Sequence, residues 1–220
     1  MGSIINNPVV GALIKSSTVR AYDKGQTILY PDDSNVNLYL IKSGAVTMEA
    51  ITDAGEKKIL YIFGASHMFP MVSFTEKSAS SSWFYTALVD TEVYVVSYEA
   101  FMQELKEIDG FTAYNTLLSQ MLAEVHELLL RISDHTRTDS TEKIISMLLF
   151  LLEHHTSRAS SNWRVVQFPV THQFLADMTG LTRETVSLAL KILAEKKLIR
   201  YHEKGKLELN FTKLSNERHA

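Results

Sequence analysis

Two short amphipathic helix patterns, separated by Gly180, stand in the C-terminal quarter of the chain. Thr171 and Thr182 occupy the positions where a side-chain hydroxyl caps the start of each helix. Glycine suits the turn between the helices because it alone adopts a positive φ at little cost. Ala176, Gly180 and Val186 have the spacing at which a second helix crosses closely over a first. The pattern predicts a helix-turn-helix and leaves an ordinary helical hairpin as the alternative.

The first turn of the second predicted helix presents polar side chains away from its apolar stripe. Such positions enter the major groove of DNA, where Arg pairs with guanine and Glu accepts from cytosine. Residues 198–211 then alternate as a β-hairpin with a basic tip, a wing suited to phosphate contact. The candidate DNA-binding residues are Thr171, Thr182, Arg183, Glu184, Ser187, Lys191, Lys204 and Lys206.

The charge of the chain is unevenly distributed. Residues 1–161 carry 12 Lys/Arg and 19 Asp/Glu, a net charge of −7, whereas residues 162–220 carry 10 and 6, a net charge of +4. A basic C-terminal part on an acidic body favours an anionic partner such as double-stranded DNA. Chance variation on two solvated surfaces is the alternative.

Residues 18–98 read as β structure, because short apolar segments alternate with Gly-, Pro- and Asp-containing turns. Many short strands at this spacing predict an antiparallel sandwich or barrel. A helical period follows, first near 99–107 and then over 111–135. We therefore expect an α+β fold: an N-terminal antiparallel β-roll of the jelly-roll type, a long helix and a C-terminal winged helix-turn-helix.

The long helix carries an apolar heptad pattern, with steps of four and three residues. We expect this seam to form a parallel homodimer; the alternative is a single helix packed on its own β domain. The seam residues are Tyr114, Leu118, Met121, Val125, Leu128 and Ile132. A new helix starts near Asp139, so the expected domains are 1–110 for the β-roll, 111–137 for the dimerisation helix and 138–220 for DNA binding.

With these features together, the sequence resembles the CRP/FNR family of bacterial transcription regulators over nearly its whole length. Residues 181–187, Leu-Thr-Arg-Glu-Thr-Val-Ser, are very similar to the recognition-helix signature of that family. The resemblance implies base-reading roles for Arg183, Glu184 and Ser187, a small-molecule effector and RNA polymerase as a partner. Leu188 stands where the family often has Arg, which puts the usual half-site sequence in doubt.

We do not expect cyclic AMP to be the effector that the resemblance implies. Cyclic-nucleotide-binding members carry Gly-Glu and Arg-Ser pairs, where this chain has Phe69-Pro70 and Ser81-Ser82. On the long helix, an acid and two leucines replace the polar groups of cyclic AMP binders. The expected pocket is apolar and aromatic, and the same residues can instead simply fill a core. The candidate pocket residues are Met68, Phe69, Met71, Ser81, Ser82, Trp83, Tyr85, Glu124, Leu128 and Leu129.

Composition excludes several other classes. The chain has no cysteine, which rules out disulfide scaffolds, zinc fingers and Cys-ligated clusters. Its longest apolar run, residues 147–152, is too short to span a bilayer, so we expect no membrane partner and a cytoplasmic location. A haem-based gas or redox sensor using His67 or His126 is the alternative regulator. A cupin-type enzyme is the other alternative, although no catalytic set, metal cluster or resident cofactor is recognisable.

Overall fold

The computed structural model describes residues 7–33, 37–70, 82–157, 162–201 and 206–217. The chain forms two compact units, which take residues 1–54 with 59–128 and residues 55–58 with 129–220. The division falls inside the long helix α3 (Gly110–His135), so this helix contributes to both units. The finer three-part division predicted from the sequence stays a prediction.

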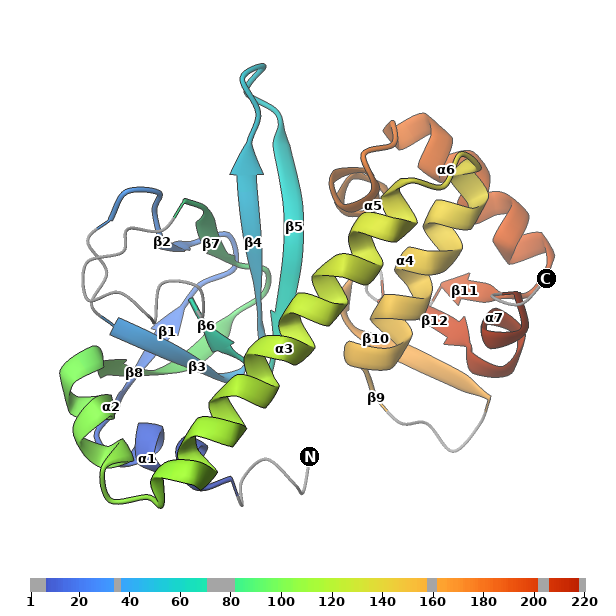
Figure 1. The fold of residues 1–220 in the computed structure, drawn as a ribbon. Helices are drawn as coiled ribbons and strands as arrows, with labels where there is room; N and C mark the ends of the chain where they lie inside the picture. The colour runs from blue at the N-terminus through green and yellow to red at the C-terminus, as the bar shows by residue number, and fades with distance from the viewer. Residues whose placement is uncertain (1–6, 34–36, 71–81, 158–161, 202–205, 218–220) are drawn as a thin grey trace. The chain divides into compact units, whose positions relative to one another are not determined.

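Unit 1 is a β-roll with helices at its two chain ends (Figure 1). Within the described residues, its strands form two four-stranded sheets of order β1-β8-β3-β6 and β2-β7-β4-β5. The elements in chain order are α1 (Pro8–Lys15), β1 (Thr18–Tyr22), β2 (Thr27–Leu29), β3 (Asn37–Ser43), β4 (Ala45–Ile51), β5 (Lys57–Gly64), β6 (Met68–Phe69), β7 (Phe84–Ala87), β8 (Thr91–Ser97) and α2 (Tyr98–Leu105). Pairings such as β3 with β8 are antiparallel, as expected. The α+β class and the roll are thereby confirmed.

The roll has an aromatic core. Phe69 stacks on Tyr39 and on Tyr85 with ring centroids 5.2 and 5.1 Å apart. Phe63 lies 5.8 Å from Phe69, again between ring centroids. Such ring pairs add about 0.5–1.5 kcal/mol each beyond burial. A second cluster joins α1, α2, the start of α3 and strands β3, β6 and β8.

Helix α1 was absent from the sequence prediction, although its start carries two signals. The side-chain oxygen of Asn7 accepts from the backbone N–H of Val9 at 2.9 Å, and Pro8 occupies the first helical position. Val9 and Leu13 are fully buried in the cluster with α2. The helix thus covers one end of the roll.

Unit 2 combines a small sheet with helices. Its sheet has the order β11-β12-β10-β9 within the described residues. The elements are α4 (Ser140–His154), β9 (Thr156–Ser157), β10 (Trp163–Pro169), α5 (His172–Thr179), α6 (Arg183–Glu195), β11 (Ile199–Tyr201), β12 (Lys206–Asn210) and α7 (Phe211–Glu217). The side chain of Asp139 caps α4 by accepting from the N–H of Glu142 at 2.9 Å, as predicted. No helix within the described ranges is long and apolar enough to cross a membrane.

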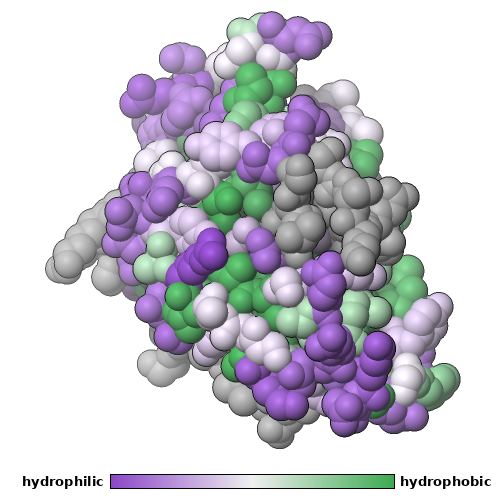
Figure 2. All heavy atoms as spheres, turned by 90° about the vertical axis from the view of Figure 1, so that its left-hand side faces the viewer, coloured by the Kyte–Doolittle hydropathy of each residue, from purple (hydrophilic) through white to green (hydrophobic). Residues whose placement is uncertain are grey.

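The surface of the molecule is mixed in character. In the face drawn in Figure 2, hydrophilic side chains cover most of the area and hydrophobic ones show between them. Scattered apolar side chains of this kind are ordinary on soluble proteins. Exposed apolar residues that repeat along one face of an element are less ordinary, and helix α3 carries such a row.

Candidate nucleic-acid interface and effector site

The turn between α5 and α6 is built as the sequence predicts. The Thr171 hydroxyl oxygen accepts from the N–H of Phe174 at 3.0 Å, and that of Thr182 accepts from the N–H of Thr185 at 3.2 Å. Gly180 ends α5 with φ 71°, in the left-handed region. Both threonine oxygens accept hydrogen bonds from backbone N–H groups that have no partner inside the helix. These two side chains therefore fix where α5 and α6 begin.

Helix α6 has one buried and one exposed face. Val186, Leu190 and Leu193 are buried against the rest of the unit, as the predicted inner stripe requires. The outer face carries the predicted contact residues, which are all exposed in this structure: Arg183, Glu184, Ser187 and Lys191. A rigid, capped helix with a free polar first turn has the form that enters a major groove.

The sequence interpretation missed an apolar row on this outer face. Leu188 is 66% exposed and Ile192, one turn further, is also exposed. They share a helix face because residues four apart are neighbours on a helix. Apolar side chains here can contact thymine methyl groups, which polar ones do not match. The spacing of Leu188 and Ile192, four residues apart, indicates this second apolar face in the sequence, but the interpretation followed only the longer inner stripe.

The wing is a β-hairpin of β11 and β12, with register Ile199 opposite Leu209. Lys206 is half-buried at the start of β12, and Lys204 lies outside the described residues. At the base of the wing, Arg200 donates to the carboxylate of Glu208 and stacks over the Trp163 ring at 4.3 Å. Arg200 thus holds the hairpin to β10.

The predicted effector residues separate into several groups. Met68 and Phe69 are fully buried core residues, and Tyr85 is buried with its hydroxyl 3.5 Å from the sulfur of Met48. Trp83 is half-buried and Ser82 exposed. The predicted Met71 and Ser81 lie outside the described residues.

A polar group on α3 faces this aromatic core. Burial raises the pKa of Glu124 to about 7. Burial also raises the pKa of the Tyr85 hydroxyl, and the Glu124 carboxylate adds to that rise. One turn earlier, Oε1 of Gln120 is buried and accepts no hydrogen bond from any described residue. Gln120 was not among the predicted residues. The Glu124 carboxyl and the Tyr85 phenol therefore place polar groups beside an apolar core.

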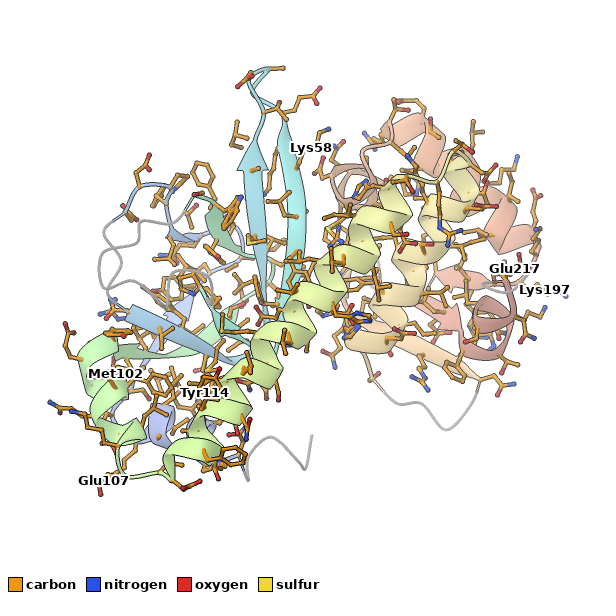
Figure 3. The ribbon with its side chains drawn as sticks, in the orientation of Figure 1. Lys58, Met102, Glu107, Tyr114, Lys197 and Glu217 are labelled. Atoms are coloured by element: carbon orange, nitrogen blue, oxygen red, sulfur yellow. The ribbon has the colours of Figure 1, made fainter. Side chains whose placement is uncertain are left out.

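The apolar residues of α3 differ from the predicted seam at two positions. Met121 packs against the core of unit 1, and Leu128 is half-buried. Leu122 and Leu129 are 59% and 58% exposed instead. Leu129 is therefore exposed with the outer row of α3, and its place in an effector pocket stays a prediction. That row comprises Phe111, Tyr114, Leu118, Leu122, Val125, Leu129 and Ile132, with Tyr114 labelled in Figure 3.

The two histidines considered for haem lie in ordinary surroundings. A ring nitrogen of His67 is 3.2 Å from the carbonyl oxygen of Gly64, in its own turn. His126 is exposed on α3. No group of three or more His, Asp or Glu side chains suited to a metal ion occurs in the described part of the chain.

Comparisons with known proteins match both units. The Crp-like helix-turn-helix domain model covers residues 142–216, and the cyclic nucleotide-binding domain model covers residues 19–107. The global nitrogen regulator of Synechococcus elongatus is 25% identical over 199 residues, 90% of this chain and 89% of that protein. The cAMP-activated global transcriptional regulator CRP of Haemophilus influenzae is 24% identical over 199 residues, 90% of this chain and 87% of that protein.

A solved structure gives the same result for the fold. FixK2 from Bradyrhizobium japonicum superposes with a TM-score of 0.76 and 22% identity, over 91% of this chain and 96% of that one. The relatives found by sequence are transcription regulators and not enzymes. With a Crp-like DNA-binding domain following a cyclic-nucleotide-binding domain, this chain belongs to the CRP/FNR family of transcription regulators.

Proposed function

We propose that the protein is an effector-responsive regulator that binds a palindromic DNA operator as a homodimer. The observation that carries the proposal is the exposed first turn of α6, capped by Thr182 and backed by a fully buried inner face. Arg183 and Glu184 on this turn can read base edges, while Lys206 in the wing serves the phosphate backbone. RNA polymerase is the proposed protein partner, and the bacterial cytoplasm the place of action.

The row of exposed apolar residues on α3 supports the homodimer. Its members repeat in steps of three and four residues, which is the seam of a two-helix coiled coil. Isolated exposed apolar residues are normal, but a continuous row marks an interaction surface. A parallel partner helix would cover the row and place two copies of α6 about one DNA turn, roughly 34 Å, apart.

The effector we propose is a neutral or hydrogen-bonding aromatic molecule rather than cyclic AMP. The two polar groups that the structure couples beside the aromatic core are the Glu124 carboxyl and the Tyr85 hydroxyl, and neither is a cation. A cyclic phosphate would need a cationic partner to repay its desolvation. A carboxyl with a pKa near 7 can donate or accept a hydrogen bond at neutral pH, which suits a polar aromatic ligand.

Selection from random double-stranded DNA tests the function. The wild-type protein should enrich two inverted half-sites, and Glu184→Ala should relax the preference at one base pair per half-site by about 1–3 kcal/mol. Glu195→Ala, at the far end of the same helix, is the matched control and should leave the preference unchanged. Failure of the wild type to enrich any sequence, with or without candidate effectors, would contradict the proposal.

A further inference from the structure

The outer face of α6 carries a leucine that the fold of unit 2 does not use. Leu188 is 66% exposed, more than any other large apolar side chain described in unit 2. Its chain neighbours Ala189 and Leu190 are both 2% exposed and belong to the inner face of the helix. The packing of unit 2 is therefore complete without Leu188, whose side chain gains little free energy from burial in this unit.

Leu188 lies in the middle of the exposed face of α6. Residues three and four positions apart are neighbours on a helix, so Leu188 has Glu184 on one side and Lys191 with Ile192 on the other. All four side chains are exposed. A ligand that contacts the polar first turn of α6 therefore also meets an apolar strip, formed by Leu188 and Ile192, one turn further along the helix.

The major groove of DNA offers one kind of apolar group to such a strip. Each base pair presents hydrogen-bond donors and acceptors there, and the C5-methyl group of thymine is the only apolar group among them. A leucine has no donor or acceptor, so a G·C pair beneath it would lose water from its polar edge and gain no hydrogen bond in return. A thymine methyl group would instead exchange water for apolar contact. A leucine at this place thus favours thymine and disfavours guanine.

The geometry of the helix limits where this thymine lies. Leu188 follows Glu184 by four residues, which is about 6 Å along the helix axis. Two base-pair steps of DNA span about 7 Å, and a tilt of the helix in the groove only shortens the separation along the DNA axis. The base pair that Leu188 meets is therefore within two steps of the pair that Glu184 meets.

We propose that Leu188 is a specificity-determining residue that reads the C5-methyl group of a thymine in each operator half-site, within two base pairs of the pair read by Glu184. This inference rests on the proposed function, because it requires α6 to enter the major groove. It goes further by naming the chemical group that is read. Since the methyl group itself is recognised, 5-methylcytosine can replace thymine in this contact.

Deoxyuridine substitution in the selected operator tests the inference, because uracil is thymine without the methyl group. Fluorescence anisotropy titration of the full chain measures the affinity for operators in which one thymine per half-site is replaced. At the position read by Leu188, deoxyuridine should weaken binding about fourfold per half-site, the loss expected for one buried methyl group and equal to about 0.8 kcal/mol. In an operator with cytosine at this position, 5-methylcytosine should strengthen binding by a similar factor.

Two variants assign the effect to the leucine. Leu188→Ala shortens the side chain, so this variant should bind the thymine and deoxyuridine operators with equal affinity. Glu195→Ala, exposed at the far end of α6, is the matched control and should keep the fourfold difference. Both side chains are exposed, so neither replacement should impair folding.

The outcomes separate this inference from the function on which it rests. If the wild type binds its operator specifically, but with equal affinity for thymine and deoxyuridine at every position, the reading of a methyl group is overturned and the proposed function stands. A fourfold difference that persists in Leu188→Ala would overturn the role of Leu188. Failure of the wild type to bind any DNA sequence specifically would overturn both.

Discussion

Replacing Glu124 by Gln removes the one carboxyl on α3 whose pKa is raised to about 7. In an unfolded chain this carboxyl has the ordinary value, 4.5. The folded state therefore binds the proton more tightly than the unfolded state. The stabilisation that proton binding at Glu124 gives the folded state is fully present below pH 4.5 and is lost as the pH rises through 7.

The size of this effect follows from the shift of about 2.5 pH units. At about 1.4 kcal/mol per unit, ionised Glu124 costs the folded state about 3 kcal/mol above pH 7. Glutamine is neutral at every pH and keeps a similar shape, so it avoids this cost. The variant should match the wild type near pH 4.5 and exceed it by about 3 kcal/mol at pH 8. In a chain of this size that corresponds to a rise in melting temperature of about 6–12 °C.

Thermal unfolding followed by circular dichroism from pH 4.5 to pH 8 measures the difference. Glu107→Gln is the matched control, because Glu107 is exposed in the same unit (Figure 3) and its replacement should leave the pH profile unchanged. A Glu124→Gln variant whose melting temperature runs parallel to that of the wild type at every pH would refute the burial of this carboxyl against the aromatic core.

Three further predictions concern the dimer, the wing and the effector. Val125→Glu places a charge on the exposed row of α3, and sedimentation should show a monomer, whereas Ser119→Glu, exposed beside the row, should leave a dimer; a dimer in both would contradict the row as the seam. Lys206→Met should weaken binding to all DNA sequences alike and reduce the salt slope by about one, measured by titration at several salt concentrations. Cyclic AMP should not change the melting temperature. A ligand that binds, at 100 times its dissociation constant, would add about 2.7 kcal/mol to the free energy of unfolding and would be detected readily.

The helix-turn-helix was predictable because its determinants are local. Thr171 and Thr182 cap helices within three residues of themselves, and Gly180 supplies a backbone conformation that its neighbours cannot adopt cheaply. The inner stripe of α6 follows from helical period alone. Local rules of this kind need no knowledge of the rest of the fold.

The orientation of α3 was less predictable, for a physical reason. The helix carries two adjacent apolar rows, and periodicity does not say which one its own domain covers. Met121 satisfied the heptad steps, yet the cluster around α1 and α2 buries it. Leu122 stands on the exposed row instead. The packing of α3 on a cluster that joins α1, α2 and strands β3, β6 and β8 decides between the two rows, and the sequence prediction lacked α1.

Helix α3 combines three kinds of surface along its length. The exposed apolar row ends at Ile132, Glu124 is a largely buried carboxyl beside Tyr85 in unit 1, and Arg131 packs on Phe150 and Met178 in unit 2. Coupling between effector and DNA sites needs an element that both sites can bias. Under the function proposed above, a ligand that changes the protonation of Glu124 acts on the same helix that carries the exposed apolar row, and we propose α3 as the element through which effector and DNA binding influence each other.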